Sequence, residues 1–329
     1  MKSLHWGIIG LGAIASDFAK ALREVNGTVY AAGSRSLDKA KKFAKEHHVE
    51  KAYGSYEELL QDENVDIVYI ATPHSNHYEY MMKCLQHRKH VLCEKAITVN
   101  ARQLKRSISM AQEKQLIVSE AMTIYHMPLY KKLREIVKAG RIGPLKMVQV
   151  SFGTRKPYDV SNRFFNKELA GGALLDTGAY ALAFARYFLT SQPNEILSTA
   201  KPTDTGVDEQ SGMLLKNADN EMAVISLTMR AKMPKRGVVA GENGFITVDD
   251  FTRPDKAVIT YTNGKTEVIE EGETAKGLNY EVEDMQAAVL HQTSSQTISL
   301  SLDVMSIMDN VREQWGITYP FEYENIRPS

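Results

Sequence analysis

The stretch that most constrains the fold is "GIIGLGAIA", near the start of the chain. A short apolar run over residues 4–9 leads directly into Gly10-x-Gly12-x-x-Ala15, and apolar residues then recur at helical spacing. Gly10 permits a tight turn, Gly12 lets backbone N–H groups approach a pyrophosphate, and Ala15 keeps the helix close to the strand. A purely structural turn is the alternative. Because the glycines lie between a strand and a helix, the pattern predicts a dinucleotide-binding turn made by Gly10, Leu11, Gly12, Ala13 and Ile14.

The first third of the chain alternates strand and helix patterns. Apolar runs predict strands at residues 4–9, 28–33, 66–71, 91–93 and 116–119. Helical patterns lie between them: one ends at Gly27, two begin with caps at Ser36 and Ser55, and two more cover residues 75–88 and 101–114. Strands that alternate with helices form a parallel, doubly wound sheet. We therefore expect residues 1–121 to form a Rossmann domain that binds the dinucleotide.

The pattern changes near Glu120. Helices are predicted at residues 128–139 and 173–189, with a strand at 145–152 between them. Strand patterns joined by tight turns follow, and Asn263-Gly264 is the strongest hairpin signal among them. Helices at residues 280–292 and 302–315 close the chain. Residues 122–329 are thus expected to form an α+β domain that binds the substrate.

Charge and hydropathy exclude several classes of protein. Lys plus Arg and Asp plus Glu both total 40, so no net field draws the chain to nucleic acid or to anionic lipid. The longest apolar run, residues 65–71, is too short to span a bilayer. The sequence starts with a strand pattern and shows no secretory signal, and Cys84 and Cys93 are expected to be reduced thiols. These features predict a cytoplasmic protein that binds neither nucleic acid nor membrane.

The end of the second predicted strand bears on the choice of cofactor. An NAD enzyme usually places an acidic residue there to accept hydrogen bonds from the ribose hydroxyls. This chain has no acidic residue between Glu24 and Asp38, and the strand ends in Gly33-Ser34-Arg35. A guanidinium with a neighbouring hydroxyl suits a 2′-phosphate. Ser34 and Arg35 therefore favour NADP over NAD, the alternative being that Arg35 is only a solvated residue at a helix entry.

The segment "TPHSNH" follows the third predicted strand. Thr72 and Pro73 leave the sheet at its carboxyl edge, where ligands bind in this architecture. His74 and His77 are only two candidate metal ligands, and no carboxylate or thiolate completes a set. We therefore expect Thr72, Pro73, His74 and His77 to line the cofactor groove, and we expect no metal.

Three further polar residues are candidates for chemistry. Glu94 and Lys95 lie side by side at the carboxyl end of the fourth predicted strand, where a lysine would reach the nicotinamide end of a bound dinucleotide. Asp176 and Tyr180 are four residues apart on a predicted helix, among Ala, Leu and Phe. The residues alone leave alternatives open: a solvated turn for Lys95, a helix cap for Asp176 and an ordinary core position for Tyr180.

The ordered motifs "GIIGLGAIASDF", "KAYGSYEELL", "TPHSNH", "VLCEK", "RIGPL", "GGALLDTGAY" and "TGVDE" resemble the Gfo/Idh/MocA oxidoreductases over nearly the whole chain. The chain is most similar to the branch of dimeric dihydrodiol dehydrogenases and NADP-dependent D-xylose dehydrogenases. The resemblance implies a Rossmann domain followed by a domain with a large, mostly antiparallel sheet. It also implies that Lys95 is catalytic and that Tyr180 is the acid/base, where most of the family has histidine. Asp176 matches the family motif and would orient Lys95 or the substrate hydroxyl. Glu94 would contact the cofactor end of the groove, the alternative being a structural role.

The chain departs from the family pattern at two positions. Ala96 stands where the family usually has proline after the Glu-Lys pair, and Thr123 stands where the dihydrodiol branch has tryptophan. Loss of the tryptophan predicts a less aromatic substrate pocket, so a sugar or polyol suits it at least as well as an arene-derived diol.

The resulting hypothesis is an NADP(H)-dependent oxidoreductase. It would transfer a hydride between the nicotinamide and a secondary alcohol, or its carbonyl, of a small sugar, polyol or cyclic diol. A reductase of a conjugated ring or imine is a second enzymatic alternative, and a non-catalytic NADP-sensing regulatory protein is an alternative of another class. The resemblance further implies a homodimer or larger homo-oligomer that packs through the open face of the second domain's sheet.

Overall fold

The computed structural model describes residues 4–293 and 297–322. The chain divides into two compact units. The first comprises Met1–Thr98, Arg102–Ala121 and Lys276–Ser299, and the second comprises Val99–Ala101, Met122–Ala275 and Leu300–Ser329. Among the described residues, no helix is both long enough and apolar enough to cross a membrane.

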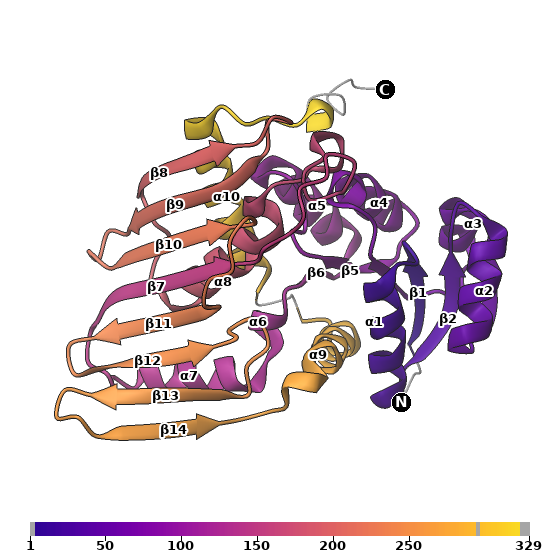
Figure 1. Cartoon of the computed structure of the whole chain (residues 1–329). Coiled ribbons are helices and arrows are strands. Elements are labelled where there is room, and N and C mark those ends of the chain that lie inside the picture. The colour runs from indigo at the N-terminus through magenta and orange to yellow at the C-terminus, as the bar shows by residue number, and fades with distance from the viewer. Residues whose placement is uncertain (1–3, 294–296, 323–329) are drawn as a thin grey trace. The chain divides into compact units, whose positions relative to one another are not determined.

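The first unit is built on a six-stranded parallel sheet in the order β3-β2-β1-β4-β5-β6 (Figure 1). The predicted doubly wound sheet is therefore confirmed. The strand order reverses between β1 and β4, and ligands of such sheets bind at the carboxyl ends of the strands that flank this point. The strands are β1 (His5–Ile9), β2 (Thr28–Gly33), β3 (Lys51–Tyr53), β4 (Ile67–Ile70), β5 (His90–Glu94) and β6 (Val118–Ala121).

The short edge strand β3 was not predicted from the sequence. It has only three residues, which pair with Ala31, Ala32 and Gly33 of β2, and none of the three is buried. An edge strand that covers no core lacks the apolar run from which strands are recognised. The other five strands of this sheet lie where they were predicted, within one or two residues at either end.

Side-chain caps begin two of the helices, as predicted. Ser36 Oγ accepts a hydrogen bond from the Lys39 backbone N–H, and Ser55 Oγ accepts one from Glu58. The two thiols, Cys84 and Cys93, are buried and form no disulfide. The helices are α1 (Ala13–Glu24), α2 (Leu37–His47), α3 (Tyr56–Gln61), α4 (His74–Gln86), α5 (Ala101–Lys114) and α9 (Gly277–His291).

Helix α9 belongs to the first unit, although it comes from the range assigned to the second domain, residues 122–329. It packs beside α1, and its Asn279 side chain donates to the Ala21 carbonyl and to the Glu24 carboxylate at 3.2 and 2.9 Å (Figure 1). Val282 and Met285 join the apolar cluster under the sheet. The sequence pattern showed an amphipathic helix here, but it could not show which sheet the apolar stripe would cover.

The second unit is built on an eight-stranded sheet in the order β14-β13-β12-β11-β7-β10-β9-β8. Strands β7 and β10 pair in parallel and the other described neighbours pair antiparallel, which confirms the predicted, mostly antiparallel sheet. Its strands are β7 (Leu145–Gly153), β8 (Glu195–Pro202), β9 (Asp208–Lys216), β10 (Met222–Thr228), β11 (Arg236–Gly241), β12 (Gly244–Asp249), β13 (Lys256–Tyr261) and β14 (Thr266–Glu270).

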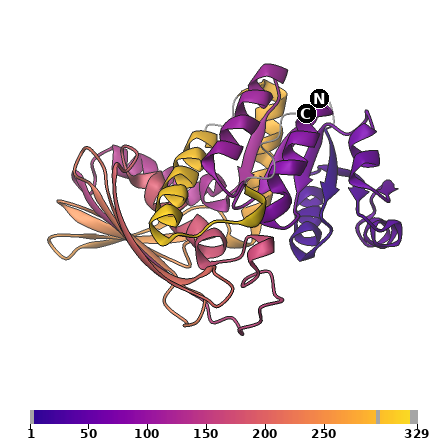
Figure 2. The same ribbon diagram turned by 90° about the horizontal axis from the view of Figure 1, so that it is seen from above.

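Helices of the second unit cover one face of this sheet (Figure 2). The predicted single helix over residues 173–189 is divided: a π-helical turn, Leu174–Gly178, precedes α8. In a π turn each backbone hydrogen bond joins residues five apart instead of four, and such turns often occur at functional sites. The other helices are α6 (Thr123–His126), α7 (Pro128–Lys138), α8 (Ala179–Phe188) and α10 (Ile298–Trp315).

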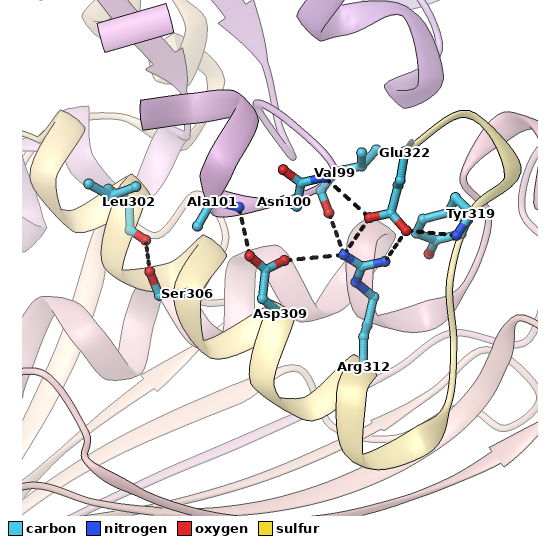
Figure 3. A network of polar contacts seen from close by, with 9 residues as sticks. All are labelled: Val99, Asn100, Ala101, Leu302, Ser306, Asp309, Arg312, Tyr319 and Glu322. Carbon is cyan, nitrogen blue, oxygen red and sulfur yellow. Dashed lines mark hydrogen bonds and ion pairs between the residues drawn. The ribbon is translucent and has the colours of Figure 1, made fainter. Parts of the chain in front are cut away.

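A buried ion-pair network ties α10 to the distant segment around Val99 and to Glu322, which follows α10 in the chain (Figure 3). The Arg312 guanidinium donates to both oxygens of Glu322, at 2.7 and 3.0 Å, and to the Val99 carbonyl at 2.9 Å. One turn earlier, Asp309 accepts from the Ala101 backbone N–H at 2.9 Å. Removing one partner from such a network would leave a buried charge without compensation, which typically costs about 3–5 kcal/mol.

Candidate active site

The predicted glycine turn lies at the point where the strand order of the first unit reverses. Gly10 has a φ of +84°, and a Cβ atom at this position would lie 2.5 Å from the Ala71 carbonyl carbon and 2.6 Å from the Thr72 nitrogen. Only glycine combines this backbone conformation with so close an approach. The turn after β1 is therefore pressed against the turn after β4, which places two of the predicted cofactor segments together.

Gly12 has a different role from Gly10. It caps α1 with no side-chain hydrogen bond, and a Cβ built on it would meet no described heavy atom within 4 Å. The Thr72 Oγ1 is buried and has no hydrogen-bond partner among the described residues. A helix N-terminus that faces open space beside an unsatisfied hydroxyl suits the pyrophosphate of a dinucleotide. The residues at this edge therefore fit the cofactor that the sequence predicts.

The segment after β2 presents its two predicted residues differently. Ser34 is buried, and its Oγ accepts from the Ser36 backbone N–H at 3.3 Å. Arg35 is exposed near Tyr56 and Tyr80; burial raises the pKa of both phenols, and the charge of Arg35 opposes this rise. Arg35 therefore offers an exposed cation at the position where an NAD enzyme usually has an acidic residue.

Two histidines of α4 contact the loop that carries Lys95, in which the Lys95–Ala96 peptide bond is cis. His74 Nε2 lies 3.1 Å from the Lys95 carbonyl oxygen. The ring of His77 is fully buried, with Nδ1 2.9 Å from the Ala96 carbonyl oxygen and Nε2 2.8 Å from that of Thr72. Burial lowers the pKa of His77, while the two carbonyls act in the opposite sense. The prediction placed both histidines along the cofactor groove; these contacts also make them a link between the turn after β4 and the loop after β5.

Two acidic residues fix the same loop from its other sides. The Glu94 carboxylate accepts a hydrogen bond from the phenol of Tyr69, which is fully buried and stacks on Phe18. Beyond Lys95, the buried Glu120 carboxylate accepts from the Ile97 backbone N–H at 3.0 Å. Lys95 itself is half-buried. Hydrogen bonds therefore hold the loop on both sides of Lys95. A catalytic ammonium needs such support, because a small displacement of a reacting group lowers the rate.

In the second unit, Asp176 lies in the π turn and Tyr180 in the first turn of α8. Lys156, from the segment after β7, lies 3.8 Å from the Asp176 carboxylate and 3.6 Å from the centre of the Phe164 ring. Tyr180 is half-buried, with its ring 6.4 Å from that of Phe152. This unit therefore places an ammonium near the Asp176 carboxylate, and Tyr180 follows Asp176 by four residues along the same helical segment.

The structure brings the turn after β1, the turn after β4 and the Lys95 loop together within the first unit. Asp176 and Tyr180 lie on successive turns of one helical segment in the second unit, and their catalytic roles stay predictions. The pairing of Lys95 with Tyr180 joins different units and stays a prediction. Sequence reasoning missed Tyr69, Glu120 and Lys156. The first two are polar residues in strands that are buried throughout, which is a usable signal, whereas Lys156 lies in an irregular segment without any pattern. Among the described residues, no three His, Cys, Asp or Glu side chains are grouped so as to hold a metal ion.

A glycine turn that leaves room for phosphates at the switch point of a parallel sheet defines a dinucleotide-binding domain of the Rossmann type. Residues 4–122 match the oxidoreductase family with an NAD-binding Rossmann fold, and residues 130–247 match the GFO/IDH/MocA C-terminal domain. The chain belongs to the Gfo/Idh/MocA oxidoreductase family, as its motifs predicted.

Its relatives include dehydrogenases of diols and sugars. Trans-1,2-dihydrobenzene-1,2-diol dehydrogenase of Xenopus tropicalis is 34% identical over 331 residues, which cover 96% of this chain and 99% of the relative. D-xylose 1-dehydrogenase (NADP(+)) of Hypocrea jecorina is 33% identical over 366 residues, which cover 97% and 93%. The structure of KijD10, a 3-ketoreductase from Actinomadura kijaniata in complex with NADP and TDP-benzene, matches with a TM-score of 0.85 at 26% identity, covering 95% of this chain and 98% of that one.

Proposed function

We propose that this protein is an NADP(H)-dependent dehydrogenase that acts on a secondary alcohol, or its carbonyl, of a small sugar, polyol or cyclic diol. The observation that carries the proposal is the carboxyl edge of the first sheet. There the open Gly12 turn and the unsatisfied Thr72 hydroxyl are joined, through His77, to the anchored Lys95 loop. The names of the relatives support the substrate class, because they include a diol dehydrogenase and a xylose dehydrogenase.

The proposed chemistry needs a group that exchanges the hydroxyl proton. A bound nicotinamide supplies the site that accepts or returns the hydride. In the oxidation direction, the Tyr180 phenolate takes the proton of the substrate hydroxyl as the carbonyl forms, and Lys95 donates a hydrogen bond to the same oxygen. A free phenol titrates near 10, and an ammonium close to it would favour the ionised form. Asp176, held near Lys156, would orient the substrate hydroxyl or Lys95.

The preference for NADP rests on Arg35. It is exposed at the end of β2, and no acidic residue lies between Gly33 and Asp38 to accept from ribose hydroxyls. An NADP-dependent xylose dehydrogenase and a ketoreductase whose structure contains NADP are among the relatives, which supports this choice. In a binding titration, Arg35→Ala should weaken NADP much more than NAD. Equal losses for the two cofactors would contradict a role of Arg35 in reading the 2′-phosphate.

A screen of NADP⁺ reduction over aldoses, polyols and cyclic diols tests the function as a whole. We expect turnover with at least one member of these classes and its loss in Tyr180→Phe. The sensor hypothesis predicts the opposite result: tight binding of NADPH with no turnover on any of them.

We further propose a homo-oligomer that forms through the uncovered face of the eight-stranded sheet. The registers place one side chain from every strand in a single row across that face, and most members of the row are apolar. Three of them, Leu197, Val224 and Val268, are 68%, 40% and 51% exposed. Apolar side chains that share one face of a sheet and stay partly or largely exposed mark an interaction surface. From β14 to β8 the row consists of Val268, Val258, Thr247, Val238, Gln149, Val224, Leu214 and Leu197.

A further inference from the structure

The buried carboxylate of Asp208 contacts the start of the helical segment that carries Asp176 and Tyr180. Asp208 begins β9 and is 1% exposed. Its Oδ2 accepts a hydrogen bond of 2.8 Å from the backbone N–H of Leu174, the first residue of the π turn. A carboxylate at a helix N-terminus satisfies a backbone N–H that has no partner within the helix, and it interacts favourably with the helix dipole. Here the cap comes from a residue far away in the sequence.

Gly172 makes this contact possible. Its φ is +118°, and a Cβ atom at this position would lie 2.3 Å from Asp208 Oδ1. The two family motifs "GGALLDTGAY" and "TGVDE" therefore meet in space, with the glycine of the first leaving room for the carboxylate of the second. The adjacent Gly171 is held as well, because its carbonyl accepts from the Tyr319 hydroxyl at 2.9 Å and its N–H donates to the Asn166 carbonyl at 2.9 Å.

The charged and titratable groups that face Asp208 come from the C-terminal part of the chain. Arg312 of α10 and the phenol of Tyr319 interact with it electrostatically, and Arg312 is itself paired with Glu322. Burial raises the pKa of the Asp208 carboxyl to about 7, and the backbone N–H of Leu174 and the charge of Arg312 oppose that rise. Burying a carboxylate costs free energy unless it is hydrogen-bonded. The hydrogen bond from the Leu174 N–H therefore stabilises Asp208 in its buried position.

We propose that Asp208 is a positioning residue for catalysis: its contact with Leu174 fixes where the π turn begins, and thereby where Asp176 and Tyr180 point. This inference rests on the proposed function of Tyr180. Asp176 and Tyr180 follow Leu174 by two and six residues, so a shift of the helix start is passed directly to both side chains. A displacement of about 1 Å in a reacting group can lower a rate by about a hundredfold.

The test compares four variants with the wild type on an accepted substrate. Asp208→Ala should lower kcat by about tenfold or more while the affinity for NADP(H) changes less than about twofold, because the cofactor residues lie in the other unit. Asp208→Asn should restore most of kcat, because its amide oxygen can still accept from Leu174. Gly172→Ala should lower kcat like Asp208→Ala, because its methyl group would displace the carboxylate. Glu209→Gln is the matched control, since the adjacent Glu209 pairs with Lys201 and Arg230 instead of the helix.

The double variant separates positioning from general damage. Removing the Asp208 side chain makes room for the Gly172 methyl group, so Gly172→Ala should cost less kcat in the Asp208→Ala background than in the wild type. Additive losses, or a kcat within about twofold of wild type in Gly172→Ala, would overturn the proposal. The latter measurement decides the matter even if Asp208→Ala does not fold.

Amide hydrogen exchange distinguishes failure of this inference from failure of the proposed function. Asp208→Ala should speed exchange in residues 173–180, whereas Glu209→Gln should not. Unchanged exchange in that segment would overturn the role of Asp208 as an anchor. If the wild type turns over no substrate, the proposed function and the catalytic part of this proposal are both overturned. Faster exchange in Asp208→Ala would then still show that Asp208 anchors the start of the π turn.

Discussion

The two glycines of the first turn should respond to the same substitution in opposite ways. A methyl group at Gly12 would meet no atom of the described residues beyond its chain neighbours within 4 Å, and the backbone there, at φ −102°, is accessible to any residue. Gly12→Ala should therefore leave the folded state intact. A methyl group at Gly10 would lie 2.5–2.6 Å from the Ala71–Thr72 backbone at a φ of +84°. The left-handed conformation costs about 1–2 kcal/mol and the overlap about 1–3 kcal/mol more, because backbone cannot move aside as a side chain can.

Thermal unfolding without cofactor and a titration with NADPH together measure both effects. Gly10→Ala should lower the unfolding temperature by several degrees, in line with a destabilisation of about 2–5 kcal/mol. Gly12→Ala should unfold within about one or two degrees of the wild type and yet bind NADPH at least about tenfold more weakly, because its methyl group occupies the space left for the pyrophosphate. Wild-type affinity in Gly12→Ala would refute the assignment of this turn as the phosphate cradle. A normal unfolding temperature in Gly10→Ala would refute the steric argument.

Three other predictions concern the chemistry, the buried carboxyl and the assembly. Lys95→Ala and Tyr180→Phe should each lower kcat about a hundredfold or more, and their combination should lower it little further, because both serve one proton transfer; steady-state kinetics with near-normal turnover in Tyr180→Phe would reassign the acid/base. The pKa of Asp208, raised to about 7 in the folded protein, means that the folded state holds a proton which the unfolded chain releases. Its contribution to stability is therefore present at low pH and is lost as the pH rises from about 4 to about 7, so the unfolding temperature of Asp208→Asn relative to wild type should rise across that window. Val224→Lys should convert the proposed oligomer to a monomer, measured by sedimentation, and turnover per chain serves as the control. An unchanged sedimentation coefficient would mean that this face is not the interface.

The sequence predicted the elements that bury a regular apolar pattern. Five strands of the first sheet were found because both of their faces are covered, and the caps at Ser36 and Ser55 follow from local hydrogen bonding alone. Strand β3 was missed because it covers no core. The association of α9 with the first unit was missed because an apolar stripe on a helix does not show which sheet it will pack against.

Only part of the candidate site could be predicted from the sequence. Motif residues such as Gly10 and Lys95 could be proposed because their place after a strand has a chemical meaning. The parts played by Glu120 and Asp208 could not, since each acts through a main-chain N–H that is distant in sequence, and only the folded chain brings the two together. The π turn likewise leaves no periodic signal, because it inserts a single residue into a helix.

Helix α9 belongs to the first unit but lies late in the sequence, which affects how the chain folds during synthesis and how it can be cut into fragments. A ribosome has released all six strands of the parallel sheet once residue 121 has emerged, yet the helix that packs beside α1 follows only at Gly277–His291. During that interval the apolar cluster around Phe18 and Leu22 lacks Val282, Met285 and Val289. Such a nascent chain exposes apolar surface of the kind that chaperones bind. For the same reason, a fragment cut after residue 121 should be less stable than the complete first unit, and transferring this unit to another protein should require both of its separated pieces.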